Sequence, residues 1–185
     1  ELARAVGRHI PTLAEVLDLV AGRMLAHVDV KEPEYEVEVV TAALDTLGPD
    51  GFVITGEDAV VRAAKSADPR VRTALSLGRG PFEIPLSRQV QVRHSELWPL
   101  RRVRACGADG VAMHHGLARA GALRTVARAG VPAMIWTVND ARLIRRFLYD
   151  PRVAVLVTNY PGLALRERGG PLGHPPGPLG WGNHV

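Results

Sequence analysis

The sequence predicts an α/β fold of the (β/α)8 barrel (TIM-barrel) type, of which six of eight βα units are visible. Short apolar segments alternate with amphipathic ones along the chain, which is typical of right-handed βαβ units around a parallel sheet. The predicted strands are nearly all apolar, as strands covered on both faces must be. An open, doubly wound sheet is the alternative, but no Gly-x-Gly-x-x-Gly turn follows a predicted strand. We therefore favour the barrel.

The first predicted element is a helix that begins near Thr12. Either Pro11 occupies its first turn or Thr12 caps it, and Glu15 follows Thr12 at the spacing of a capping box. An apolar stripe at helical spacing comes next, formed by Leu13, Val16, Leu17 and Val20.

Strands and helices then alternate without interruption up to residue 77. Gly48 closes one helix and Asp68-Pro69 stops the next, because glycine commonly ends helices and the residue before proline disfavours the helical conformation. In chain order we expect a strand at 25–31, a helix at 34–47, a strand at 51–55, a helix at 57–67 and a strand at 71–77.

The second half resumes this alternation after an irregular segment at 78–94 that holds Pro81 and Pro85. In chain order we expect a helix at 95–106, a strand at 110–114, a helix at 118–129, a strand at 131–138, a helix at 140–149, a strand at 153–158 and a helix at 161–168. The predicted organisation is one partial barrel domain at 1–168, followed at 169–185 by a Gly/Pro-rich tail that we expect to be disordered.

The composition is that of a globular domain. The 185 residues (20.0 kDa) are 46% apolar and 23% charged, enough for one domain with a substantial core. No apolar run approaches the roughly 20 residues of a membrane helix, so we expect no transmembrane segment. Cys106 is the only cysteine, which excludes an internal disulfide and favours a small buried side chain. The cytoplasm is the slightly favoured compartment.

The charge pattern argues against nucleic acid as a partner. The net charge is +4, but the arginines follow helices rather than alternating with aromatic residues, which make up 5% of the chain. Lys31 and Lys65 are the only lysines, and Lys31 stands out because it lies at the end of a predicted strand.

Polar side chains gather where the predicted strands end, which is where a barrel keeps its chemistry. Asp29 and Lys31 are two residues apart, so both project from the same face of their strand. A carboxylate beside an ammonium can hold a metal ion and a phosphate together, or it can form a plain ion pair. The other polar or aromatic residues at strand ends are Thr55, Ser76, His114, His115, Trp136, Thr137, Asn139, Thr158 and Asn159.

Several of these residues also have a purely structural interpretation. Adjacent strand residues point to opposite faces, so His114 and His115 cannot both face a site while the strand lasts, and each is a candidate for a packed histidine. Trp136 is as compatible with packing in the barrel core as with lining a functional site. Asn139 or Asp140 is expected to cap the helix that follows.

Five short motifs follow one another along residues 10–168. They are Ile10-Pro11-Thr12-Leu13, Asp29-Val30-Lys31, Gly107-Ala108-Asp109-Gly110 leading to His114-His115, Trp136-Thr137-Val138-Asn139 and Val157-Thr158-Asn159-Tyr160-Pro161. In this order and spacing the chain resembles the glycerophosphodiester phosphodiesterases. The resemblance implies a (β/α)8 fold that uses a divalent metal, Ca²⁺ or Mg²⁺, to hydrolyse a small-molecule phosphodiester to glycerol 3-phosphate and an alcohol.

The resemblance also implies roles for individual residues. Asp29 becomes a metal ligand, Lys31 binds the phosphate and Trp136 lines the glycerol side of the substrate, with His114 and Asn159 as further pocket candidates. Asp29 stands where the family usually has the longer Glu, and Asn159 stands where Asp is common. The family's catalytic histidines lie on two earlier strands, so we expect the catalytic residues to lie outside this chain.

Three functions remain open at this point. The first is metal-dependent glycerophosphodiester hydrolysis, with little activity expected from this chain alone. The second is a catalytically inactive barrel that serves as a binding module, motivated by the departures at Asp29 and Asn159. The third is a related barrel phosphodiesterase that acts on a lipid head group. A barrel short of two strands has open edges, so we also expect self-association of the chain.

Overall fold

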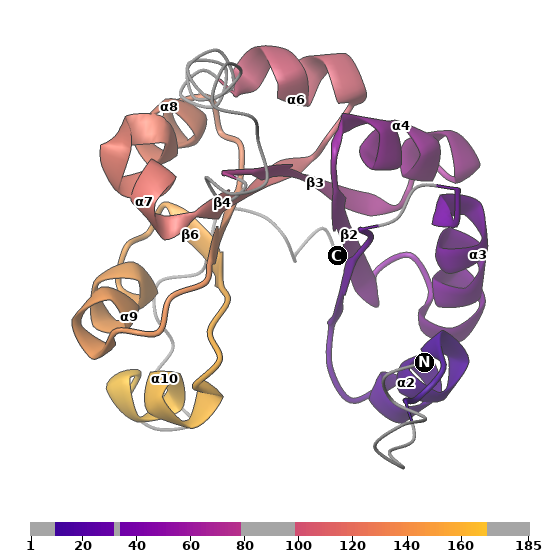
Figure 1. Ribbon diagram of the computed structural model, residues 1–185, viewed down its shortest axis with the longest axis horizontal. Coiled ribbons are helices and arrows are strands. Elements are labelled where there is room, and N and C mark those ends of the chain that lie inside the picture. The colour runs from indigo at the N-terminus through magenta and orange to yellow at the C-terminus, as the bar shows by residue number, and fades with distance from the viewer. Residues whose placement is uncertain (1–9, 32–33, 79–98, 170–185) are drawn as a thin grey trace.

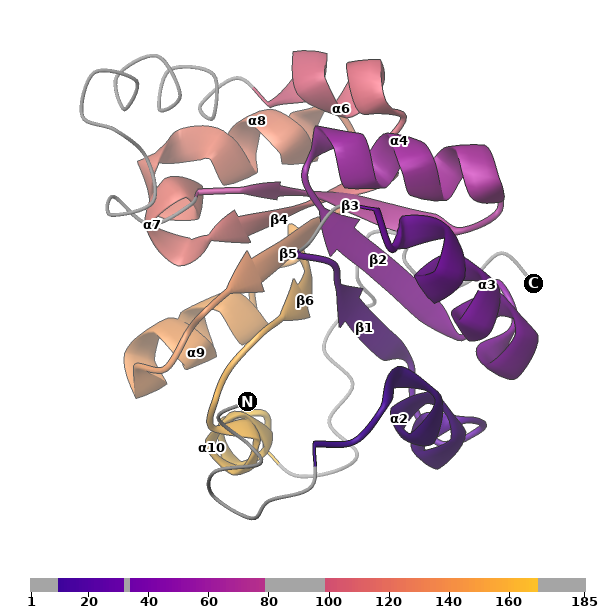
Figure 2. The same cartoon turned by 45° about the vertical axis from the view of Figure 1, so that its right-hand side comes forward.

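The computed structural model describes residues 10–31, 34–78 and 99–169, to which every structural statement below refers. Six parallel strands form one sheet in the order β1-β2-β3-β4-β5-β6 (Figure 1 and Figure 2). They are β1 (Ala26–Asp29), β2 (Phe52–Gly56), β3 (Arg72–Leu77), β4 (Gly110–His114), β5 (Ala133–Trp136) and β6 (Val153–Leu156). Each strand pairs with its neighbours in sequence, as in a barrel, whereas a doubly wound sheet reverses its strand order.

Helices connect successive strands and lie on the outer side of the curled sheet (Figure 2). They are α2 (Leu13–Val20), α3 (Glu36–Leu47), α4 (Asp58–Ala67), α6 (Leu100–Cys106), α7 (His115–Leu117), the π-helix η1 (Ala118–Ala122), α8 (Leu123–Arg128), α9 (Ala141–Leu148) and α10 (Pro161–Glu167). The first part of the helix predicted at 95–106 and the segment after residue 169 fall outside the described residues.

Side-chain caps fix the starts of α2 and α9. Thr12 caps α2, because its hydroxyl accepts the N–H of Glu15 at 3.3 Å while the Glu15 carboxylate accepts the N–H of Thr12 at 2.7 Å. Asp140 caps α9 by accepting the N–H of Leu143 at 3.0 Å. The capping box is therefore confirmed, and of the two candidates at the start of α9 it is Asp140 that caps.

The helix predicted at 118–129 begins earlier and is not regular. It starts at His115 as α7 and passes through η1, within which Gly121 has a φ of 120°. A glycine adopts this φ without the steric cost that a side chain would add, so the chain kinks there before continuing as α8.

Several strands are shorter than predicted. The strand predicted at 131–138 is β5, and the strand predicted at 25–31 is β1. Their flanks stay extended through single backbone hydrogen bonds, such as Val30 N–H to Thr55 O and Val138 N–H to Val157 O, each at 2.9 Å. The strand ends therefore keep the direction of the sheet after regular pairing stops.

Alternate strand residues supply two different layers of the core. Outward-facing residues such as Phe52, Leu75 and Ile135 pack beneath the helices in two clusters. Inward-facing residues form a third cluster that contains no helix residue: Val53, Ala74, Ala112 and Met134, with Trp136, Ala154, Val155 and Val157 against it. Cys106 is buried in an outer cluster, as predicted.

The sheet is an open part of a barrel. Among the described residues β1 and β6 each pair with one strand only, so both outer edges of the sheet are unpaired. The α/β class and the barrel-like strand order are confirmed, while the count of eight units stays a prediction. No helix of the described chain has the length and apolarity needed to cross a membrane.

Candidate functional site

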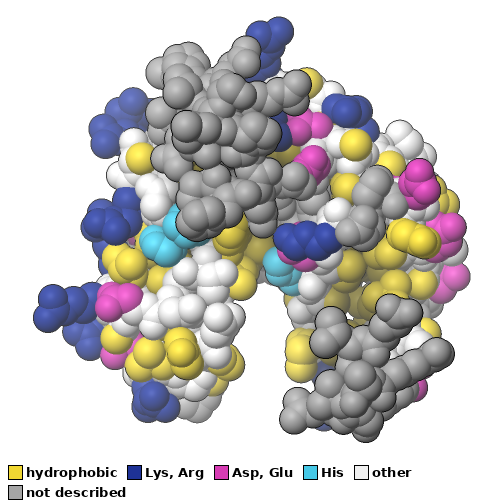
Figure 3. Space-filling model, in the orientation of Figure 1, with side chains coloured by type: hydrophobic (Ala, Val, Ile, Leu, Met, Phe, Trp, Pro, Cys, Tyr) yellow, Lys and Arg dark blue, Asp and Glu magenta, His cyan; other side chains and the backbone are white. Residues whose placement is uncertain are grey.

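A pocket of about 550 Å³ opens at the carboxyl ends of the strands, on the inner face of the sheet. Its lining comes from all six strands or the residues that directly follow them: His27, Asp29, Val30, Lys31, Thr55, Gly56, Glu57, Ser76, Leu77, Ala112, Trp136, Thr137 and Val157. Figure 3 shows the molecule hollowed between its two halves, with histidine side chains on both sides of the hollow. This is the end at which barrel folds carry out chemistry.

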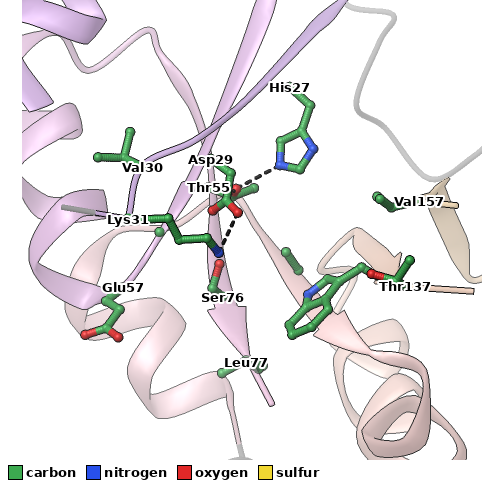
Figure 4. Close-up of a pocket in the computed structure, with 13 residues that line it drawn as sticks. His27, Asp29, Val30, Lys31, Thr55, Glu57, Ser76, Leu77, Thr137 and Val157 are labelled. Carbon is green, nitrogen blue, oxygen red and sulfur yellow. Dashed lines mark hydrogen bonds and ion pairs between the residues drawn. The ribbon is translucent and has the colours of Figure 1, made fainter. Parts of the chain in front are cut away.

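Asp29 and Lys31 form an ion pair at this end of β1. The Lys31 Nζ lies 2.6 Å from Asp29 Oδ2, and both side chains project into the pocket (Figure 4). The prediction that the two residues share a face is confirmed. The pair leaves the ammonium accessible, since 75% of the Lys31 side chain is exposed.

The other lysine has a different use. Lys65 on α4 lies 2.9 Å from Asp109 Oδ1 and 3.2 Å from the carbonyl of Pro69, and only 20% of its side chain is exposed. Asp109 also accepts the N–H of Thr73 at 2.7 Å, which ties the beginnings of β3 and β4 together. Lys65 is thus a scaffold residue at the opposite end of the strands, and Lys31 is the lysine that a ligand can reach.

Thr55 holds the Asp29 carboxylate from the neighbouring strand. The two residues are directly opposite each other in the parallel register of β1 and β2. The buried hydroxyl of Thr55 donates a hydrogen bond to Asp29 Oδ1 at 3.0 Å. Both carboxylate oxygens of Asp29 are therefore engaged, Oδ1 by Thr55 and Oδ2 by Lys31.

His27 belongs to the same group, and the sequence analysis missed it. Its Nε2 lies 2.8 Å from Thr55 Oγ1, although His27 itself is opposite Val53 in the register. Burial lowers the pKa of His27, the negative charge of Asp29 works against that effect, and the positive charge of Lys31 adds to it. The sequence does contain a signal for His27: His27, Asp29 and Lys31 are every second residue of one strand, so all three project from the same face.

Thr137 lies across the pocket from Lys31 (Figure 4), and its neighbour in sequence, Trp136, also lines the pocket. The Trp136 ring meets His114 edge-on with centroids 5.5 Å apart, because His114 and Trp136 are register partners on β4 and β5. His114 supports this wall from beside it and is not one of the residues that line the pocket.

His114 and His115 lie together rather than on opposite faces. The strand ends at His114 and a helix begins at His115, so strand alternation no longer applies, and the two ring centroids are 4.1 Å apart. The Nδ1 of His114 accepts the N–H of Gly116 at 3.1 Å, and the Nδ1 of His115 lies 3.1 Å from the carbonyl oxygen of Thr137. Burial, and then the charge of His115, lower the pKa of His114.

Asn159 lies in a turn after β6, outside the pocket lining. Its backbone N–H donates to Asn139 Oδ1 at 3.0 Å, and Thr158 Oγ1 lies 3.4 Å from the same oxygen. Asn139 therefore connects the turns that follow β5 and β6.

The described residues do not by themselves assemble a site for a divalent metal. No group of three or more His, Cys, Asp or Glu side chains able to hold an ion occurs among them. Asp29 offers a carboxylate whose two oxygens already have partners, whereas Ca²⁺ takes six to eight oxygen ligands and Mg²⁺ six.

Comparison with known proteins places the fold. No protein-family model matches the chain, and no curated protein sequence matches it. A crystal structure of a protein assigned as a glycerophosphoryl diester phosphodiesterase from Silicibacter pomeroyi DSS-3 matches with a TM-score of 0.67 and 23% identity, covering 87% of this chain and 57% of that one.

Two further crystal structures agree with the first. A protein assigned as a glycerophosphodiester phosphodiesterase from Galdieria sulphuraria has a TM-score of 0.65 and 14% identity, covering 87% of this chain and 65% of that one. A glycerophosphodiester phosphodiesterase from Parabacteroides distasonis ATCC 8503 has a TM-score of 0.59 and 13% identity, covering 86% of this chain and 64% of that one. The predicted resemblance is confirmed as a likeness of fold, and the chain spans less than two thirds of each of these structures.

Proposed function

We propose that the chain carries the phosphate-binding part of a glycerophosphodiester phosphodiesterase active site. The observation that carries this proposal is the exposed Lys31 ammonium, held by Asp29 beside a pocket of about 550 Å³ at the carboxyl ends of parallel strands. The likeness of the fold to three proteins named as phosphodiesterases of this kind supports the proposal.

Each wall of the pocket suits one part of such a substrate. Lys31 attracts a phosphodiester anion, because an ammonium supplies both charge and several N–H donors. Trp136 offers an aromatic surface to the glycerol carbons, and Thr137 and Ser76 add polar groups from neighbouring strands. In the proposed reaction water adds across one P–O bond and gives glycerol 3-phosphate and an alcohol.

Dependence on Ca²⁺ or Mg²⁺ is a further part of the proposal. Asp29 is the residue of this chain that we assign to the metal, and the other ligands would come from residues outside the described part. A divalent cation would supply stabilisation of negative charge on the phosphate oxygens.

The test is the release of glycerol 3-phosphate from glycerophosphodiesters that differ in their alcohol. It is carried out on the 185-residue chain and on a longer product that completes the barrel, with and without EDTA. Lys31→Ala should abolish release in any active form, whereas Lys65→Ala, which changes the scaffold lysine, serves as the matched control. Activity that survives both EDTA and Lys31→Ala would refute the proposal.

The second candidate function is a catalytically inactive barrel that binds a phosphodiester without turnover. The composition of the pocket favours it, because the described residues bring no group of three or more His, Cys, Asp or Glu side chains together to hold an ion. Binding of a glycerophosphodiester that is lost in Lys31→Ala, with no product from any form of the protein, would establish this alternative over the enzyme.

A further inference from the structure

Four side chains form one continuous chain of contacts across the floor of the pocket (Figure 4). His27 Nε2 lies 2.8 Å from Thr55 Oγ1, Thr55 Oγ1 lies 3.0 Å from Asp29 Oδ1, and Asp29 Oδ2 lies 2.6 Å from Lys31 Nζ. This network of contacts begins at the imidazole of His27, on the exposed face of β1, and ends at the exposed ammonium of Lys31.

The hydrogen atoms in this chain can be assigned from the chemistry of its members. A hydroxyl group has one hydrogen, and the carboxylate of Asp29 can only accept, so the Thr55 hydrogen points to Asp29 Oδ1. The oxygen of Thr55 must then accept from His27, which requires the hydrogen of a neutral His27 to be on Nε2. The donors therefore all point toward the carboxylate.

This network of contacts fixes the position of the Lys31 ammonium, which is otherwise free to move. Lys31 is long and exposed, and Asp29 is the partner of its ammonium. Thr55 is buried and, as a β-branched residue, is rigid at χ1, so its hydrogen bond to Oδ1 orients the plane of the Asp29 carboxylate. The orientation of that plane determines where Oδ2 holds the Lys31 ammonium.

We propose that His27 and Thr55 are positioning residues that orient the Asp29 carboxylate so that it presents the Lys31 ammonium to a phosphate group in the pocket. This inference rests on the proposed function, because it takes Lys31 as the phosphate-binding residue. It adds a dedicated support for that lysine, drawn from Thr55 on the neighbouring strand and from His27 on the strand of the ion pair.

Two pairs of variants test the support. Thr55→Val removes the hydroxyl at nearly constant shape and Thr55→Ser restores it. His27→Leu removes the N–H donor, and His27→Gln restores a donor near the position of Nε2. The probe is inorganic phosphate, titrated into the full 185-residue chain in EDTA and followed by ³¹P NMR, with thermal melts to confirm folding.

Thr55→Val and His27→Leu should each weaken phosphate binding about three- to tenfold, the range expected for the loss of one hydrogen bond. Thr55→Ser and His27→Gln should bind within about twofold of the parent, because each keeps the lost donor. Affinity in folded Thr55→Val and His27→Leu that equals the parent affinity would overturn the proposal, as would equal losses in all four variants.

The tautomer of His27 gives a readout that needs no ligand. At about pH 8, where an imidazole is neutral, ¹⁵N NMR should place the hydrogen of His27 on Nε2 in the parent and show a mixture of tautomers in Thr55→Val. A parent His27 with its hydrogen on Nδ1 would overturn the positioning role. If phosphate does not bind the parent protein while His27 has its hydrogen on Nε2 as expected, the proposed function is wrong but the hydrogen-bond network of His27, Thr55 and Asp29 is confirmed.

Discussion

A β-carbon added to Gly78 would lie 2.9 Å from the Cβ of His114, closer than such atoms approach one another. Gly78 follows β3 with a φ of +86°, and His114 ends the neighbouring strand β4. The absence of a side chain lets the backbone at Gly78 lie directly beside the histidine that supports Trp136.

Gly78→Ala is therefore expected to destabilise the protein by about 2 to 4 kcal/mol, because alanine adds both the strain of a positive φ and the contact with His114. Gly130→Ala is the matched control, since Gly130 has a φ of +69° and no atom within 4 Å of an added Cβ. It should cost about 1 to 2 kcal/mol, from φ strain alone. Urea unfolding measures the free energy of unfolding of both variants. Equal losses of stability in Gly78→Ala and Gly130→Ala would contradict the close approach of Gly78 to His114.

An ion pair between Asp58 and Arg102 joins α4 to α6. The Arg102 Nε donates to Asp58 Oδ1 at 3.3 Å, and the Arg102 Nη2 donates to Asp58 Oδ2. Burial raises the pKa of Asp58, but the hydrogen bond and the charge of Arg102 outweigh burial, so the pKa lies below its ordinary value of 3.8. A carboxylate with a lowered pKa stabilises the folded state above its unfolded pKa and loses that effect as the pH falls through the folded value.

Asp58→Asn should thus lower the free energy of unfolding at pH 7 by about 0.5 to 1.5 kcal/mol and cause a smaller loss at about pH 3. Denaturant unfolding at both pH values provides the measurement. Asp50→Asn, which removes an exposed partner of Arg72, should leave stability unchanged at both. A loss in Asp58→Asn that is independent of pH would show that packing, rather than charge, holds the two helices.

Trp136 is expected to supply binding energy through its aromatic surface. Trp136→Ala should weaken the affinity for a glycerophosphodiester about five- to tenfold, whereas Trp136→Phe should stay within about twofold. Ligand-observed NMR in EDTA measures affinity whether or not the protein turns the ligand over. Unchanged affinity in Trp136→Ala would place the ring in the barrel core alone.

The unpaired edge of β1 is expected to drive self-association of the chain. Leu25, directly before this edge, is 47% exposed, and exposed apolar edge strands pair readily with other chains. Leu25→Lys should reduce the mass measured by light scattering, because a charged edge resists pairing. Leu165→Lys on α10 changes an equally apolar surface residue and should have no such effect. A monomeric parent chain would contradict this prediction.

The local features of the fold could be predicted from the sequence. The capping box of Thr12 and Glu15, the helix end at Gly48 and the shared face of Asp29 and Lys31 all depend on residues within one turn of helix or two positions along a strand. Such patterns persist in the folded protein because they are set by backbone geometry. The α/β alternation followed from the same local signals.

The site depended on relationships between distant segments, which only the tertiary structure decided. The register of β1 against β2 places Thr55 beside Asp29 and within reach of His27, and no local pattern states that register. The end of β4 at His114 likewise brings two histidine rings together that an uninterrupted strand would have separated. The sequence by itself determined which side chains share a face of one strand, and the packing of strand against strand determined which side chains of different strands meet, because that choice is made by contacts between residues far apart in the sequence.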